Sequence, residues 1–296
     1  CLLRGCIPSK ALLHVGRVLA EAREMEEWGI SFPKPTIAID ALRTRKEKVI
    51  GALTGGLAQL AKRRNVRVVQ GEARFADSGT LSIALADGGS ETLTYDHCIL
   101  ASGSRPAKIP AFDIGSPRVM DSTGALELAD IPESLLVIGG GYIGLEMGTV
   151  YAELGSQVSV VELTAGLLPG ADRDLVKPLQ KRLETLFAAI RLETKVVRLE
   201  DRGDGIEVFF EGPDGATSQT FSLVLVAVGR RPNSDGIGLE NTDVVVDVKG
   251  FVGVDGQQRT ADPRILAIGD VCGEPMLAHR ASHQGKVAVE VLHGEP

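Results

Sequence analysis

A strand, a glycine-rich turn, a helix and a second strand succeed one another near the middle of the 296-residue chain. Residues 135–138 predict a buried strand, and the glycines of a GxGxxG spacing follow directly at Gly139, Gly141 and Gly144. Helical spacing then continues through residue 154. Glycines at these positions let the chain turn tightly, approach a pyrophosphate and seat helix against strand. This βαβ unit predicts a dinucleotide-binding α/β domain.

Glu162 directly follows the second strand of this unit (residues 158–161), 18 residues beyond the last glycine. A carboxylate there can accept hydrogen bonds from adenine ribose hydroxyls and repels the 2′-phosphate of NADP. The next residues are Leu163, Thr164 and Ala165, where arginines would have attracted that phosphate. The sequence therefore favours NAD over NADP, with a tight glycine turn that binds nothing as the alternative.

Two cysteines, Cys1 and Cys6, flank four residues at the entrance to a helix expected over residues 9–28. Unpaired N–H groups and the macrodipole at a helix N-terminus stabilise an anion, which favours Cys6 as a thiolate. The spacing allows a redox-active disulfide across one distorted turn. A zinc site and a purely structural disulfide are the alternatives, and zinc would need further Cys or His ligands at close spacing. Cys98 and Cys272 are interpreted as packing residues.

Two acidic residues have both a functional and a structural interpretation. Asp270 follows the buried-type strand at residues 265–268, where a carboxylate can hydrogen-bond a sugar-like hydroxyl, although such an acid also serves as a helix cap. Glu146 lies in the first turn of the helix after the glycines, where an acid stabilises the helix dipole.

The remaining pattern alternates between helices and strands. We expect further helices at residues 40–64, 174–187 and 277–292, the first interrupted by glycines, and further strands at residues 66–70, 81–85, 98–101, 192–198, 206–210, 223–228 and 250–255. The last segment is too short to form a domain and must pack on something earlier.

The composition excludes several classes of partner. Apolar residues make up 44% of the chain and charged residues 24%, which suits two domains with their own cores. A net charge of -7 argues against nucleic acid and anionic membrane partners, because both require a basic surface. No run of 18 apolar residues occurs, so no membrane span is expected.

Taken in order, these motifs resemble those of the pyridine nucleotide-disulfide oxidoreductases. The matching segments are residues 1–10 (the redox-active disulfide), 100–106 and 225–232 (the two crossover motifs), 139–146 (the NAD fingerprint) and 267–270 (the FAD ribityl motif). Two departures stand out: Leu3-Arg4 replaces the usual Asn-Val between the cysteines, and Ser102 replaces a threonine in the first crossover.

The resemblance implies an α/β fold with two Rossmann-like, three-layer domains that bind FAD and NAD. It assigns residues 1–112 to the FAD-binding domain, residues 113–233 to an NAD-binding domain inserted in it, and residues 234–296 to the return segment of the first. The first FAD-binding strand is expected before Cys1, and an interface domain with a His–Glu pair after Pro296. The chain is therefore expected to show little activity by itself, and none of its histidines is assigned as the acid–base catalyst.

The resemblance also implies roles for individual residues. Cys1 corresponds to the thiol that exchanges with substrate and Cys6 to the charge-transfer thiol, while Lys10 lies near flavin N5 and pairs with Glu146. The implied cofactor-binding residues are Lys10, Ser102, Gly103, Gly139, Gly141, Gly144, Glu162, Gly229, Asp270, Met276, Leu277 and Ala278. No metal ligand is implied.

Within the family, residues 7–14, 141–151 and 275–279 most resemble the bacterial branch that reoxidises dihydrolipoamide. That branch passes electrons through the cysteine pair and FAD to NAD. It implies a lipoyl group of a 2-oxoacid dehydrogenase or glycine cleavage complex as the partner, a homodimer for the complete protein, and a cytoplasmic location. An NADPH-dependent disulfide reductase of the glutathione or mercuric type is the alternative enzyme. A non-catalytic nucleotide-binding module is the alternative class, and it would have no use for Cys1, Cys6 and Lys10.

Overall fold

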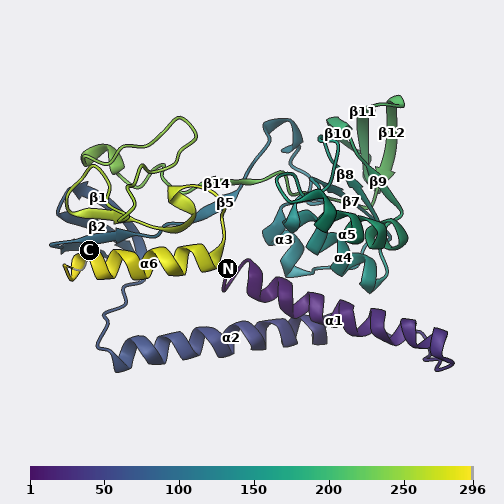
Figure 1. Cartoon of the computed structure of the whole chain (residues 1–296), viewed down its shortest axis with the longest axis horizontal. Helices are drawn as coiled ribbons and strands as arrows, with labels where there is room; N and C mark the ends of the chain where they lie inside the picture. Colours follow the sequence, from purple (N-terminus) through teal and green to yellow (C-terminus); the bar gives the residue numbers. More distant parts are fainter. Residues whose placement is uncertain (295–296) are drawn as a thin grey trace. The chain divides into compact units, whose positions relative to one another are not determined.

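The computed structural model describes residues 1–294, and the chain divides into two compact units (Figure 1). Unit 1 comprises Cys1–Gln59 and Pro106–Gly229, and unit 2 comprises Leu60–Arg105 and Arg230–Pro296. The first 59 residues therefore pack with the central part of the chain, whereas the resemblance assigns them to the FAD-binding domain. The domain assignment stays a prediction.

Unit 1 is built on a five-stranded parallel sheet with the strand order β6-β13-β7-β8-β9. These strands are β6 (Val119–Met120), β7 (Ser134–Ile138), β8 (Gln157–Val161), β9 (Ala189–Arg191) and β13 (Leu223–Val226). An antiparallel sheet of β10 (Lys195–Asp201), β11 (Ile206–Gly212) and β12 (Gly215–Phe221) is inserted between β9 and β13. Strand order reverses on either side of β7, and ligands of open α/β sheets bind at the carboxyl ends of the strands beside such a point.

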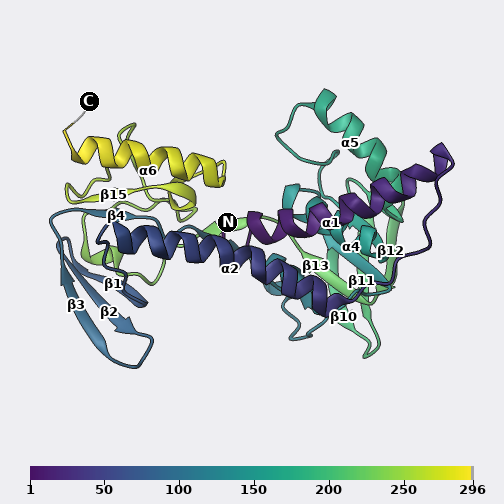
Figure 2. The same ribbon diagram turned by 90° about the horizontal axis from the view of Figure 1, so that it is seen from below.

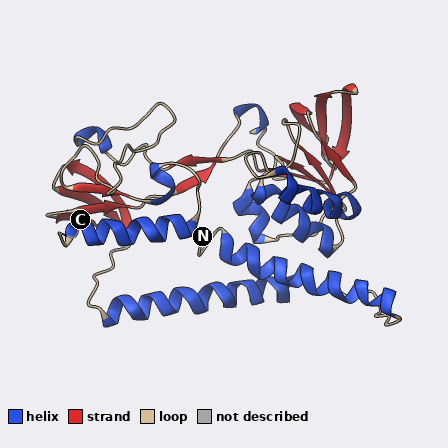
Figure 3. Cartoon of the chain, viewed as in Figure 1, coloured by secondary structure: helices blue, strands red, loops and turns tan. Residues whose placement is uncertain are grey.

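Three layers of unit 1 follow from the alternation of side chains along β7. Leu135 and Val137 face the helices, whereas Leu136 and Ile138 face the antiparallel sheet, and all four are buried. The helices are α1 (Cys6–Glu24), α2 (Ile39–Arg63), α3 (Ser122–Glu127), α4 (Tyr142–Leu154) and α5 (Arg173–Leu186) (Figure 3). A sheet covered on both faces requires continuous apolar strands, which is what the sequence of β7 supplies.

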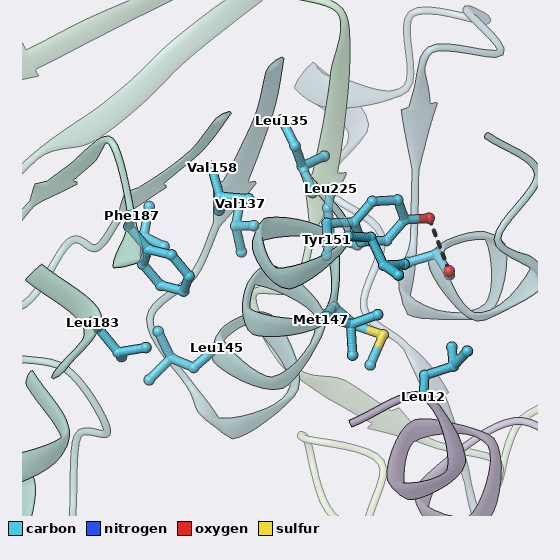
Figure 4. Close-up of a cluster of buried hydrophobic side chains, with 14 of the residues drawn as sticks. Leu12, Leu135, Val137, Leu145, Met147, Tyr151, Val158, Leu183, Phe187 and Leu225 are labelled. Atoms are coloured by element: carbon cyan, nitrogen blue, oxygen red, sulfur yellow. Dashed lines mark hydrogen bonds between the residues drawn. The ribbon is translucent and has the colours of Figure 1, made fainter. Parts of the chain in front are cut away.

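The core on the helical side of the sheet is closed by a buried aromatic side chain (Figure 4). Tyr151 of α4 is 1% exposed, and its hydroxyl donates to the carbonyl oxygen of Ala125 in α3 over 3.0 Å. Burial and the nearby Asp130 carboxylate raise the pKa of Tyr151, so this hydroxyl keeps its proton. Leu12 of α1 and Met147 of α4 belong to the same cluster.

Helix α1 packs along α4 through both apolar and charged contacts (Figure 2). A Cβ on Gly16 would lie 3.2 Å from the Cβ of Glu153, so glycine permits the close approach of the two helices. Glu153 is 6% exposed and forms an ion pair with Arg23. Helix α2 is anchored by Lys46, which is buried and donates to the carbonyl oxygen of Leu126 over 2.7 Å.

Unit 2 contains three small sheets and one long helix. Its strands are β1 (Gly71–Asp77), β2 (Thr80–Leu85) and β3 (Ser90–Thr94) in an antiparallel sheet, β4 (Cys98–Leu100) parallel to β15 (Ile265–Ala267), and β5 (Ser104–Pro106) beside β14 (Arg230–Pro232). Helix α6 (Ala278–Leu292) buries Ala288 and Val291 against Leu266.

Three expected elements were wrong in detail. Residues 66–70 form no strand, because the alternating Val66 and Val68 are both exposed and β1 begins only at Gly71. Residues 250–255 contribute only an isolated bridge from Val252. The strand expected at residues 192–198 begins only at Lys195, as β10, since the chain turns at Glu193 with a φ of 49° after β9.

Two further findings concern the helices. The glycines of α2 do not interrupt it, and the helix runs unbroken for 25 residues. None of the helices described for residues 1–294 is long and apolar enough to cross a membrane.

Candidate dithiol site and cofactor loops

The glycines between β7 and α4 serve different physical purposes. Gly139 has a φ of 111°, and a Cβ there would lie 2.5 Å from the carbonyl oxygen of Ala227. A Cβ on Gly144 would overlap the carbonyl oxygen of Gly139. Gly141 differs, because no heavy atom of the described residues lies within 4 Å of the place its Cβ would take. The chain itself requires Gly139 and Gly144, whereas Gly141 leaves open space at the start of α4.

Glu162 holds this loop in place through three hydrogen bonds. It is 8% exposed, and its Oε2 accepts from the backbone N–H of Gly140 over 2.7 Å. Its Oε1 accepts from the backbone N–H and the hydroxyl of Thr164, each over 2.8 Å. A carboxylate offers about four acceptor sites, so one remains for a ribose hydroxyl. The sequence pointed to the ribose role alone and missed that the same side chain supports the glycine turn.

Replacing Glu162 by alanine is expected to lower the free energy of unfolding by about 2–4 kcal/mol, since two backbone N–H groups lose their acceptor. Thr164→Val removes only the hydroxyl donor and is expected to cost about 1 kcal/mol. Urea unfolding of both variants checks the difference. Equal stability of Glu162→Ala and the unaltered chain would show that the carboxylate does not support the loop.

The Cys1–Cys6 segment folds back onto the start of α1. The helix begins at Cys6, three residues earlier than expected, and the N–H of Ile7 donates to the carbonyl oxygen of Cys1 over 3.1 Å. A Cβ on Gly5 would lie 3.0 Å from the Cα of Cys1, so glycine permits this turn. Both cysteines are exposed free thiols in the structure, and the disulfide that the resemblance implies stays a prediction.

Lys10 of α1 meets Glu146 of α4, as the resemblance implies. The Lys10 ammonium forms an ion pair with Oε1 of Glu146, and the hydroxyl of Ser9 donates to Oε2 over 2.5 Å. Ser9 is 5% exposed and was not identified from the sequence. The only signal in the sequence is that Ser9 directly precedes Lys10. In the structure it lies on the face of α1 that α4 covers. One carboxylate thus joins two donors on α1, whereas the catalytic roles of Lys10 and Glu146 stay predictions.

The other two cysteines lie in less reactive surroundings. Burial raises the pKa of the Cys98 thiol to about 11. Burial, opposed by Arg280, raises that of Cys272 to about 12. Both pKa values exceed the value of about 8.5 for an unfolded thiol. Their contribution to stability is therefore complete below pH ~8.5 and is lost as the pH rises through about 11 to 12.

We expect iodoacetamide at pH 8 to modify Cys1 and Cys6 at least about tenfold faster than Cys98 and Cys272, because the thiolate is the nucleophile and the buried thiols keep their protons. Mass spectrometry of the peptides over time measures the four rates. Faster labelling of Cys272 than of Cys6 would contradict this assignment.

In unit 2, the first crossover segment lies beside Asp270. Oδ2 of Asp270 accepts from the hydroxyl of Ser104 over 2.5 Å. Asn233 donates from its side chain to the carbonyl oxygen of Ser102 over 2.9 Å and from its backbone to that of Gly103. Gly103 has a φ of 70°, with open space where a Cβ would be. The hydroxyl of Ser102 is buried and has no hydrogen-bond partner in the described part of the chain.

The other predicted cofactor residues lie at two separate places in the fold. Met276 and Leu277 precede α6, where Leu277 is the N-cap and Ala278 the first residue. Gly229 belongs to unit 1, has a φ of 127° and accepts at its carbonyl oxygen from the N–H of Ala107 over 3.0 Å. Their roles in cofactor binding stay predictions.

Comparison with solved structures supports the fold. The chain matches LpdA from Mycobacterium tuberculosis with a TM-score of 0.89 at 25% identity, over 100% of this chain and 64% of that one. It matches the HOCl-induced flavoprotein disulfide reductase RclA from Escherichia coli with a TM-score of 0.85 at 26% identity, over 100% of this chain and 63% of that one. The predicted α/β fold with parallel sheets is confirmed.

Sequence comparison identifies the family. The chain is 48% identical over 296 residues to a dihydrolipoyl dehydrogenase of Vibrio parahaemolyticus and 49% identical over 295 residues to one of Haemophilus influenzae. It spans 62% of the length of these relatives. The family model described as pyridine nucleotide-disulphide oxidoreductase matches residues 1–285, and the chain therefore belongs to that family.

Proposed function

We propose that this chain carries the dithiol-oxidising core of a dihydrolipoyl dehydrogenase, which oxidises dihydrolipoamide and reduces NAD. One observation carries the proposal. Glu146 lies on α4, two residues beyond the last glycine of the GxGxxG loop, and binds Lys10 and Ser9 on the helix that begins at Cys6. The cysteine pair and the dinucleotide loop are thus joined within unit 1. A nucleotide-binding module without turnover gives no reason for this connection.

The chemistry of the cysteine pair is thiol–disulfide exchange. A thiolate of dihydrolipoamide attacks the sulfur of Cys1 in the Cys1–Cys6 disulfide, and Cys6 leaves as a thiolate. The second substrate thiol then displaces Cys1 from the mixed disulfide, which yields lipoamide and a reduced cysteine pair. Two electrons have moved from substrate to protein. Cys6, as the first residue of α1, has its charge stabilised by the unpaired N–H groups there.

The residues of unit 2 fit a flavin. Ser102 supplies a donor, because its buried hydroxyl has no partner in the described residues. Gly103 leaves open space, and the Asp270 carboxylate supplies an acceptor. Asp270 would accept from a ribityl hydroxyl, and the backbone of Met276, Leu277 and Ala278 would face the flavin pyrimidine. Bound FAD would take the two electrons of the dithiol and deliver them as hydride to NAD.

Glu146 holds the Lys10 ammonium beside the cysteine helix through an ion pair. The carboxylate binds the ammonium through Oε1, and the hydroxyl of Ser9 satisfies Oε2. Exposure of the two side chains, 60% for Lys10 and 29% for Glu146, leaves the pair partly open. We propose that this cation lies beside the flavin and favours the negative charge that develops on reduction.

NAD is the proposed acceptor. Gly141 leaves space for a pyrophosphate at the N-terminus of α4, and Glu162 would accept from an adenine ribose hydroxyl. The carboxylate would repel the 2′-phosphate of NADP. The proposed partner is the lipoyl group of a 2-oxoacid dehydrogenase or glycine cleavage complex, and the complete protein is proposed to be a homodimer.

The alternative enzyme is a disulfide reductase of the glutathione type, and the chain resembles a flavoprotein disulfide reductase in structure. The oxidised chain is treated with either dihydrolipoamide or reduced glutathione, and protein thiols are counted with a chromogenic disulfide. We expect dihydrolipoamide to produce two additional thiols, and Cys1→Ser to produce none. Faster reduction by glutathione would favour the alternative reductase, and no additional thiols with either reagent would contradict the proposal.

A further inference from the structure

A directed chain of hydrogen bonds links the second crossover segment to Asp270 within unit 2. Arg230 of β14 donates from Nε to the hydroxyl oxygen of Ser104 over 2.7 Å and from Nη2 to its carbonyl oxygen over 2.6 Å. The hydroxyl of Ser104 in turn donates to Oδ2 of Asp270 over 2.5 Å. The three groups lie on β14, on β5 and on the short 3-10 helix η4 (Gly269–Cys272) that follows β15.

The direction of this chain is fixed by chemistry. A guanidinium has only donors, so the hydroxyl of Ser104 must accept from Arg230. Its single proton is then directed at Asp270, which as a carboxylate can only accept. The arginine polarises the hydroxyl, and bonds arranged in series strengthen one another.

The hydrogen bond from Ser104 occupies Oδ2 of Asp270 and restricts the rotation of the carboxylate group. The other oxygen is left to accept from a ligand. Resting on the proposed function, we infer that Ser104 and Arg230 are positioning residues, which orient the Asp270 carboxylate toward a ribityl hydroxyl of the flavin. The two crossover segments thus have a role in flavin affinity besides connecting the strands.

A second charged contact, between β5 and the segment after β14, supplies a matched control. Arg105 of β5 forms two hydrogen bonds with Asp235, at 2.8 and 2.7 Å, on an exposed side of the ribbon. The hydrogen bond from Arg105 is the main effect that lowers the pKa of Asp235, and desolvation opposes it. None of the hydrogen bonds described for this pair reaches Asp270.

The test measures FAD binding to the complete protein by quenching of flavin fluorescence. Ser104→Ala and Arg230→Gln are each expected to weaken FAD binding about tenfold, and the double variant by no more than about the same factor, because the bonds act in series. Ser104→Thr, which keeps the hydroxyl, is expected to bind within about threefold of the unaltered chain, as is Asp235→Asn. Urea unfolding of each variant verifies that it is folded.

FAD analogues that each lack one ribityl hydroxyl separate positioning from a general loss of structure. With the analogue that lacks the hydroxyl bound by Asp270, Ser104→Ala is expected to bind as well as the unaltered chain. Unchanged FAD affinity of Ser104→Ala, or an equal loss with every analogue, would overturn the inference while the proposed function stands. Failure of the complete, unaltered protein to bind FAD would instead contradict the flavin proposal, and the inference with it.

Discussion

Gly139→Ala and Gly144→Ala are each expected to lower the free energy of unfolding by about 3 kcal/mol, whereas Gly141→Ala is expected to change it by less than about 1 kcal/mol. Gly139 combines a φ of 111° with a carbonyl oxygen 2.5 Å from the place of its Cβ. At Gly144 the added methyl group would overlap the backbone of Gly139 and lie 2.9 Å from Val137. Neither obstacle can move without displacing the end of β13 or the turn between β7 and α4.

The matched variant Gly141→Ala separates folding from binding. Its φ of −79° suits any residue and its Cβ meets no described atom, so the chain tolerates the methyl group. The same methyl group would occupy the space proposed for the pyrophosphate, and NAD affinity is expected to fall at least about tenfold. Urea unfolding and calorimetric titration with NAD measure the two effects. A Gly141→Ala chain that is as destabilised as Gly144→Ala would contradict the division of roles.

Serine in place of either cysteine is expected to reduce dihydrolipoamide-driven flavin reduction by about a thousandfold or more, because exchange requires both sulfurs. The two variants differ in the absence of substrate. Without Cys1, Cys6 cannot form a disulfide and stays reduced, so a long-wavelength charge-transfer band is expected before any reductant is added. Without Cys6, no such band is expected under any condition.

The control for the cysteine variants is flavin reduction by NADH, which bypasses the cysteine pair and is expected to remain within a few-fold of the unaltered chain. Cys272→Ser should behave as the unaltered chain does, since burial keeps that thiol protonated with a pKa of about 12. Stopped-flow absorbance measures each rate. A band in resting Cys6→Ser that is absent from Cys1→Ser would reverse the two assignments.

Local patterns in the sequence were enough to predict the βαβ unit at β7, α4 and β8. Continuous apolar strands, a glycine spacing and a following acid are all contained within about 30 residues, and together they indicate this unit. The pairing of Lys10 with Glu146 required the resemblance, because the two residues are 136 positions apart. Nothing local joins them.

The features that the sequence did not predict correctly depend on contacts between distant parts of the chain. Residues 66–70 carry a strand pattern without a partner strand, and apolar alternation alone does not form a ladder. Ser9, Ser104 and Arg230 are unremarkable in sequence. Their contacts with Glu146 and Asp270 arise only when helices or strands far apart in the chain meet.

The most direct test of the proposed electron relay is an anaerobic titration of the complete protein, with FAD bound, by dihydrolipoamide and then by NAD, monitored by visible absorbance. We predict a long-wavelength charge-transfer band that grows with dihydrolipoamide and is bleached by NAD as NADH absorbance appears. Reduction of the flavin by NADPH alone, with no band from dihydrolipoamide, would contradict the account.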